Sequence, residues 1–295
     1  MKVDVNSTIN LNRRDYFLKA VMTREEQIAL ITSFGRVLLI DLSKLSFQNK
    51  LSDMKMNHIS EYYTLYKSEE IIEVLNTELK NNSLLYSATK KGKISIQVVN
   101  DIESMTKTID TNEEDPVVSV GIVSETKGKL ALFTKSGRAL VTGLDNIRAK
   151  NEPTKGIKGI TLEDGDELLA AFSFDNIEQT YYFFMTENGY GAKIPLSILR
   201  EQKRGGKGKV YIHITEKNGR PITIKKIVDS KVNFIYVTEK CKISYFNRGG
   251  SKSLIELPTF YNIIQGVKMI PYDEKPIFLS DIELFKLGQV LKKIE

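Results

Sequence analysis

Residue types that often carry chemistry are scarce in this sequence: 295 residues include no tryptophan, one cysteine and two histidines. One cysteine excludes an internal disulfide framework, and with two histidines beside it a structural zinc site is not expected. His58 lies in a polar connection and His213 in an expected strand, so we interpret both as structural or exposed residues. We find no nucleophile with a plausible general base, and we therefore expect no catalysis, cofactor or metal site.

Long apolar runs are also missing. No stretch reaches the 18 apolar residues of a membrane-spanning helix, and no signal peptide begins at Met1. We therefore expect a soluble cytoplasmic protein. The length suits one large all-β domain or two ordinary domains.

Positive charge is concentrated in one part of the chain. Residues 186–268 hold 16 Lys and Arg against 6 Asp and Glu, a net of +10, whereas residues 100–185 hold 9 against 15, a net of −6. A focused positive field attracts polyanions better than the same charge spread evenly. The alternative interpretation is a solvated surface that is rich in lysine.

The centre of this basic region is a glycine-rich stretch, Gln202-Lys203-Arg204-Gly205-Gly206-Lys207-Gly208-Lys209. It is too rich in glycine for a helix or strand interior and too poor in apolar residues for a core. Its composition suits a polyphosphate ligand. It is not a nucleotide-binding P-loop, because Lys203 stands where that motif needs the first glycine and Val210 where it needs serine or threonine.

A short pattern recurs along the chain: an apolar strand, Thr-x-x-Gly, a cation or aromatic residue, and a second apolar strand. The threonines are 57, 45, 52 and 52 residues apart: Thr32, Thr89, Thr134, Thr186 and Thr238. Each copy predicts a β-hairpin whose three-residue turn ends on a glycine with positive φ. Cys241 replaces that glycine in the fifth copy, and a weak sixth copy begins at Ile277–Ser280.

Each repeat carries about four expected strands in roughly 50 residues, which is typical of a propeller-like ring of blades. Residues 68–80 have helix-forming composition, but the repeat register predicts a strand near Ile71–Leu75. Most of the 26 tyrosines and phenylalanines fall inside expected strands, so we interpret them as packing residues of the blades.

The repeats and the glycine-rich stretch together resemble the C-terminal domain of the type IIA topoisomerase family, from bacterial DNA gyrase (its A chain) or the paralogous topoisomerase IV. Residues 202–208 resemble the gyrase box of that family, and Met185–Gly191 and Thr134–Ala170 also match it. The resemblance implies an all-β fold, a six-bladed β-pinwheel with strands exchanged between neighbours. We expect a tail at residues 1–11 and one pinwheel domain at residues 12–295.

In that family duplex DNA bends around a basic outer rim, and the resemblance implies this role here. The box residues expected to contact DNA are Gln202, Lys203, Arg204, Gly205, Gly206, Lys207 and Gly208, with Lys209 beside them. Further rim candidates are Arg36, Lys93, Arg138, Lys155, Lys158, Lys193, Lys242, Arg248 and Lys252. The expected partners are double-stranded DNA, bound mostly through phosphates, and the cleavage domain and ATPase subunit of a topoisomerase.

The box lies in the fourth repeat, whereas in gyrase it precedes the first full repeat. The eroded fifth repeat is typical of topoisomerase IV, so the sequence leaves both relatives open. A propeller-type protein-interaction scaffold is the alternative function, supported by the acidic third repeat.

Overall fold

The computed structural model consists of strands joined by turns. The residues that it describes are 26–45, 58–76, 82–100, 102, 105–123, 128–175, 180–227, 233–238, 243–246, 267–268 and 276–282. Short 3₁₀ turns within these ranges are η2 (Leu42–Lys44), η4 (Ile59–Glu61), η5 (Leu144–Asn146) and η6 (Leu196–Ile198). None of the helical turns in these ranges has the length and apolar character needed to cross a membrane.

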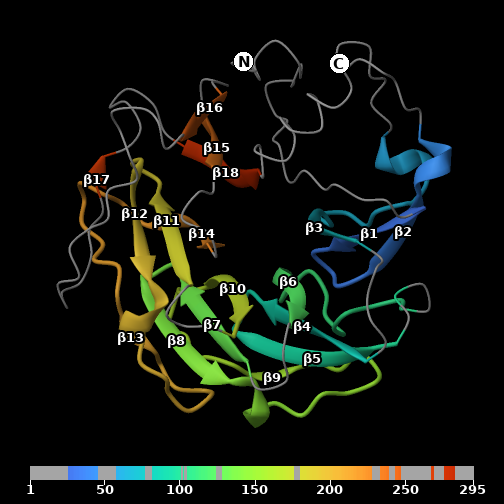
Figure 1. Cartoon of the computed structure of the whole chain (residues 1–295), viewed down its shortest axis with the longest axis horizontal. Coiled ribbons are helices and arrows are strands. Elements are labelled where there is room, and N and C mark those ends of the chain that lie inside the picture. The colour runs from blue at the N-terminus through green and yellow to red at the C-terminus, as the bar shows by residue number, and fades with distance from the viewer. Residues whose placement is uncertain are drawn as a thin grey trace. The chain divides into compact units, whose positions relative to one another are not determined.

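Five antiparallel hairpins follow one another along the chain, as the repeats predicted (Figure 1). Their strands are β1 (Gln27–Thr32) and β2 (Val37–Asp41), β4 (Ser83–Thr89) and β5 (Lys93–Val99), β7 (Lys129–Thr134) and β8 (Arg138–Gly143), β11 (Tyr181–Thr186) and β12 (Tyr190–Pro195), and β15 (Asn233–Thr238) and β16 (Ile243–Phe246). The β-branched and aromatic residues in these runs favour extended backbone on a buried surface.

The Thr-x-x-Gly sequence forms the turn of each of the first four hairpins. In the second, the Gly92 N–H donates to the Thr89 carbonyl at 2.9 Å and the Lys93 N–H donates to Thr89 Oγ1 at 3.2 Å. Gly92 has φ +79°, which glycine adopts without side-chain strain. The corresponding side-chain bonds are made by Thr32, Thr134 and Thr186. The predicted turn type is confirmed in these four hairpins.

A further strand in each repeat pairs with the first strand of its hairpin. These strands are β3 (Ile71–Asn76), β6 (Val117–Val123), β10 (Leu168–Phe174), β14 (Pro221–Ile227) and β18 (Pro276–Ile282). β3 pairs with β1, so the segment with helix-forming composition contains a strand, as the repeat register predicted. Pairing with a neighbouring strand overrides the intrinsic helix preference there.

Between its hairpin and this further strand, a repeat passes a short strand to the preceding sheet. β9 (Ile157–Lys158) follows β8 but pairs with β5, and β17 (Val267–Lys268) follows β16 but pairs with β12. β13 (Lys209–Val210) follows β12 and joins the edge of β8. A single bridge between Arg36 and Lys107 marks the same crossing at the first hairpin. The strand exchange implied by the resemblance is therefore present.

The described strands form five sheets, which we number in chain order. Their strand orders are β2-β1-β3, β6-β4-β5-β9, β10-β7-β8-β13, β14-β11-β12-β17 and β16-β15-β18. The all-β prediction is confirmed. The prediction that a sixth repeat begins at Ile277–Ser280 is wrong, because these residues lie in β18, which pairs with β15 in sheet 5. Six blades are thus not confirmed in the part of the chain that the structure describes.

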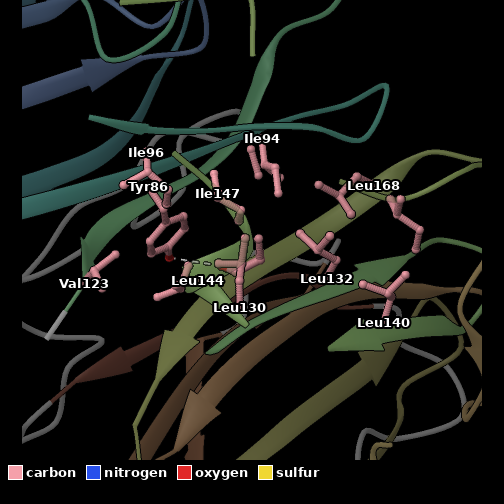
Figure 2. Close-up of a cluster of buried hydrophobic side chains, with 13 residues drawn as sticks. Tyr86, Ile94, Ile96, Val123, Leu130, Leu132, Leu140, Leu144, Ile147 and Leu168 are labelled. Atoms are coloured by element: carbon pink, nitrogen blue, oxygen red, sulfur yellow. Dashed lines mark hydrogen bonds between the residues drawn. The ribbon is translucent and has the colours of Figure 1, made fainter. Parts of the chain in front are cut away.

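Sheets 2 and 3 share a core of aliphatic side chains (Figure 2). Ile94 of sheet 2 and Leu130 and Leu132 of sheet 3 are fully buried, and burying each such side chain stabilises the fold by about 1.5–3 kcal/mol. The Tyr86 hydroxyl donates to the Ala171 carbonyl at 3.1 Å and so joins the two sheets. Burial raises the pKa of Tyr86, which keeps this donor protonated.

Aromatic side chains pack within the sheets, as the sequence predicted. The rings of Phe133 and Phe172 stack with centroids 5.3 Å apart, and Phe183 and Phe184 are fully buried. A second core, with Ile31 among its members, joins sheets 1 and 2.

The chain divides into two compact units. The first contains sheets 1 and 2, strands β7, β8 and β10 of sheet 3, and the segment Leu199–Lys209; the second contains strands β11, β12 and β14–β18. The predicted tail at 1–11 lies outside the described residues, and the single domain at 12–295 stays a prediction. The glycine-rich box belongs to the first unit, where its surroundings are described below.

Candidate nucleic-acid interface

The box crosses from its own hairpin to the edge of sheet 3. Glu201 forms a bridge with Val141 of β8, and the Gln202 N–H donates to the Val141 carbonyl at 2.8 Å. The Glu201 carboxylate pairs with Lys129 of β7 at 2.8 Å. Two strands of sheet 3 therefore hold Glu201 and Gln202, where the chain enters the box, because an exchanged strand must cross this edge.

The glycines of the box rest on the segment that follows β9. The Gly205 N–H donates to the Gly159 carbonyl at 2.7 Å, and the Thr161 N–H donates to the Gly206 carbonyl at 2.9 Å. Thr161 Oγ1 donates to the Gly205 carbonyl at 2.6 Å. These bonds fix the middle of the box to the chain that supplies the edge strand of sheet 2. Small residues permit this approach of two backbones.

Gly208 is the box residue under the tightest steric constraint. Its φ is +67°, and a Cβ atom there would lie 2.7 Å from the carbonyl oxygen of Ala139 in β8. A side chain would therefore need both a rare backbone conformation and a shift of backbone atoms. Only glycine lets the chain pass β8 at this point and continue into β13.

We expect Gly208→Ala to weaken binding to a 40-base-pair DNA duplex about tenfold while every cation of the box is retained. The displaced backbone changes where those cations stand relative to one another, and contacts with a rigid polyanion depend on that spacing. Fluorescence anisotropy at 0.1 M salt measures the effect.

The control for this prediction is Gly165→Ala. Gly165 also has a positive φ, +74°, but no atom lies within 4 Å of its Cβ position. This variant carries the backbone strain alone, of about 1–2 kcal/mol, and should bind DNA like the wild type. Equal affinities for both variants would show that the path of the box past β8 is irrelevant to binding.

The cations of the box face solvent. Lys203, Arg204, Lys207 and Lys209 are exposed, and none of them has a carboxylate within ion-pair distance in the part of the chain that the structure describes. Arg204 Nη1 donates to the Lys158 carbonyl at 2.6 Å. We call the set of exposed cations on the box and on residues 155–161, which include β9, the box surface: Lys155, Lys158, Lys203, Arg204, Lys207 and Lys209.

The box glutamine differs from these exposed cations in being partly buried. The Gln202 side-chain nitrogen is buried without a hydrogen-bond partner among the described residues. The side-chain oxygen lies 3.9 Å from the Cβ position of Gly206. Gln202 thus packs under the loop, and it is not among the exposed members of the box surface.

Three further rim candidates are the cations that follow the turn glycines, and each forms an ion pair. Arg36 pairs with Glu69 at 2.6 Å, Lys93 with Asp115 at 3.1 Å and Arg138 with Glu163 at 2.8 Å. The exposed fraction of the acidic side chain differs greatly, at 0%, 7% and 48% in the same order. The first two acids are therefore buried structural partners, whereas the third stands at the surface.

The Arg36 pair is embedded in sheet 1. The guanidinium donates through Nε and Nη2 to the two Glu69 oxygens, at 2.8 and 2.6 Å, and through Nη2 to the Thr64 carbonyl. It also lies 4.7 Å from the ring centroid of Tyr66. Burial would raise the pKa of Glu69, but hydrogen bonds from Arg36, Thr32 and the Tyr66 N–H outweigh burial and lower it. Arg36 thus has a structural role in sheet 1, because its guanidinium is occupied by Glu69 and the Thr64 carbonyl.

The remaining candidates have other surroundings. Lys193 is buried, and its Nζ lies 4.2 Å from the ring centroid of Tyr181. Lys242, Arg248 and Lys252 lie outside the described residues, as does Cys241. DNA contact by any of these residues stays a prediction.

The acidic turn of the third repeat is tied to neighbouring hairpins. Glu167 pairs with Lys90 of sheet 2 and Lys135 of sheet 3, each at 2.7 Å, and these lysines lower its pKa. Asp166 accepts from the Ser136 N–H at 2.9 Å and from its hydroxyl at 2.6 Å. The described residues contain no group of three or more His, Cys, Asp or Glu side chains arranged for a metal.

Sequence reasoning missed the partners that decide which cations are free. Glu69 and Asp115 each stand two residues before the strand that completes their sheet, and both pair with the turn cation. Aligning the repeats on that strand would have revealed the pattern. Gly159 and Thr161 support the box through hydrogen bonds that involve their backbone atoms. No sequence pattern marks these two residues as partners of the box.

The comparisons with known proteins agree with this geometry. A family model described as "DNA gyrase C-terminal domain, beta-propeller" matches residues 26–51, 84–124, 128–175 and 180–220, more than half of the chain. Two solved structures share the fold. The C-terminal domain of DNA topoisomerase IV aligns with a TM-score of 0.75 and 19% identity over 98% of this chain and 90% of that one. The DNA gyrase A C-terminal domain aligns with a TM-score of 0.71 and 22% sequence identity. This alignment covers 94% of this chain and 89% of that one.

Two curated relatives are similar in sequence, and both are the A chain of a bacterial DNA gyrase. The gyrase chain of Kosmotoga olearia is 29% identical, and the alignment covers 67% of this chain and 25% of the relative. The gyrase chain of Borreliella burgdorferi is 26% identical, and the alignment covers 80% of this chain and 29% of the relative. The chain spans less than a third of the length of these relatives. With its repeats, exchanged strands and box in the places described above, the chain belongs to the family of DNA gyrase C-terminal domains.

Proposed function

We propose that this chain binds duplex DNA without sequence specificity and bends or wraps it, as an accessory domain of a type IIA topoisomerase. The observation that carries the proposal is the box surface, where six exposed cations stand on two segments joined by backbone hydrogen bonds. Such an array attracts successive phosphates and releases their counterions. Few of its side chains suit base-edge readout, so sequence preference should be weak.

The fixed backbone of the box supports this function. Because Gly205 and Gly206 are bonded to Gly159 and Thr161, the cations are arranged before DNA arrives, and less conformational entropy is lost on binding. Bending a site of 20–30 base pairs costs about 1–6 kcal/mol, which the phosphate contacts must offset.

The scaffold alternative loses its main support. The acidic third repeat favoured a protein-interaction role, but Glu163, Asp166 and Glu167 bind neighbouring residues of the same chain. We propose no catalysis by the chain itself. Its partners in the full enzyme would be the cleavage domain and the ATPase subunit, and its location would be the cytoplasm, on nucleoid DNA.

Salt dependence tests the proposal. We expect the 295-residue chain to bind a 40-base-pair duplex of arbitrary sequence, and the logarithm of the affinity to fall linearly with the logarithm of salt concentration. Six phosphate contacts predict a slope of about −5. Fluorescence anisotropy from 0.05 to 0.3 M salt measures it, with a second duplex of scrambled sequence as the control. Weak binding at the lowest salt, or a slope near zero, would contradict DNA binding.

Ligation of nicked plasmid in the presence of the chain tests whether DNA is wrapped. Wrapping with one handedness, as proposed for a gyrase-like domain, shifts the topoisomer distribution to one sign. Simple bending, as proposed for a topoisomerase IV-like domain, leaves the distribution centred. The two relatives left open by the sequence are separated by this result.

A further inference from the structure

Arg138 lies next to the box, but its guanidinium is occupied by an ion pair. It is the first residue of β8, and its neighbour Ala139 supplies the carbonyl against which Gly208 lies. Arg138 Nη2 pairs with Glu163 Oε1 at 2.8 Å. The cation beside Ala139 is therefore ion-paired, whereas the box cations, including Lys207 and Lys209 on either side of Gly208, are not.

The sheet 3 pair differs from its equivalents in sheets 1 and 2. In sheet 1 the buried acid Glu69, two residues before β3, pairs with Arg36. In sheet 2 the buried acid Asp115, two residues before β6, pairs with Lys93. In sheet 3 the corresponding acid is Asp166, and both of its oxygens are taken by Ser136. Arg138 therefore pairs with an acid farther from the strand, in an exposed position.

The backbone around Glu163 is fixed to the box. Thr161, two residues earlier, bonds to Gly205 and Gly206 of the box. The side chains of Arg138 and Glu163 are 24% and 48% exposed, so water screens their attraction. A phosphate held on the box surface therefore competes with Glu163 for the Arg138 guanidinium. It does not compete with Glu69 for Arg36, because the Glu69 side chain is buried.

We propose that Glu163 restrains DNA binding by holding the Arg138 guanidinium, and that loss of this carboxylate adds Arg138 to the DNA contacts. This inference rests on the proposed function. It makes Glu163 a residue that sets affinity through Arg138 and does not itself touch DNA.

Glu163→Gln tests the inference, with Asp164→Asn as the matched control. Asp164 is the adjacent exposed acid, and no ion pair is formed by it among the described residues, so both variants change net charge equally. At 0.1 M salt we expect Glu163→Gln to bind the 40-base-pair duplex about five- to tenfold more tightly. Its salt slope should be steeper by about 0.9, the value for one added phosphate contact. Asp164→Asn should change affinity less than twofold.

A double-variant cycle assigns the gain to Arg138. Arg138→Ala alone should change affinity less than twofold, and combined with Glu163→Gln it should abolish the gain. Equal gains in Glu163→Gln and Asp164→Asn would overturn the inference, since only the general field would matter. A gain that survives removal of Arg138 would overturn it too. Wild-type binding that depends on the box cations, with no effect of Glu163→Gln, would leave the proposed function standing and reject this inference alone.

Discussion

The variant K203A/R204A/K207A is expected to bind the 40-base-pair duplex about two orders of magnitude more weakly than the wild type at 0.1 M salt. These three exposed side chains make no ion pair among the described residues. Each phosphate contact contributes about 0.9 to the salt slope. At 0.1 M salt this is nearly tenfold in affinity per contact, so three contacts account for at least a hundredfold. The slope should become less steep by about 2.7.

The control removes the same charge elsewhere. Lys44, Lys67 and Lys91 are exposed lysines outside the box surface, and K44A/K67A/K91A lowers the net charge equally. We expect it to lose less than threefold in affinity. Similar losses in both triple variants would mean that net charge, and not the box, governs binding. Nicked-plasmid ligation with K203A/R204A/K207A adds a second readout: if wrapping survives its loss of affinity, the wrapping function does not lie in the box.

Arg36→Ala is expected to lower the free energy of unfolding of the first unit by about 3 kcal/mol. The Glu69 side chain is fully buried, and without Arg36 its charge has no cationic partner in the surroundings that the structure describes. Removing one partner of a buried pair costs about 3–5 kcal/mol, and the lower end applies because Arg36 is 22% exposed. Urea unfolding followed by circular dichroism, with amide exchange of β1–β3, measures the loss.

Arg138→Ala is the control for this stability effect. Its partner Glu163 is 48% exposed, so the carboxylate stays solvated when Arg138 is removed. The cost should therefore be below about 1 kcal/mol. Folded Arg36→Ala, held at low temperature, should retain DNA affinity within twofold. A variant that kept its stability but lost affinity tenfold would instead support the sequence-based prediction that Arg36 contacts phosphate.

Local sequence patterns determined most of the hairpin architecture. Thr89 and Gly92 show why. The hydrogen bond of the threonine hydroxyl and the positive φ of the glycine both lie within five consecutive residues, so the local sequence is enough to specify the turn. The strand at Ile71–Asn76 followed from the repeat register even though its composition favoured a helix. The sixth repeat was misjudged because the completing strand of sheet 5 has the same apolar composition as a hairpin strand.

The sequence also located the box and its cations, since glycine and lysine density is visible without a structure. The tertiary structure decided which cations are available. Arg36, Lys93 and Arg138 follow their turn glycines alike, yet their acids come from segments 22 to 33 residues away and differ in burial from 0% to 48% exposed. Whether a cation is neutralised depends on which carboxylate the fold brings within about 3 Å and on how much water remains there, because burial sets the strength of the pair. Strand exchange, which lays the box against Gly159 and Ala139, is likewise a product of long-range pairing.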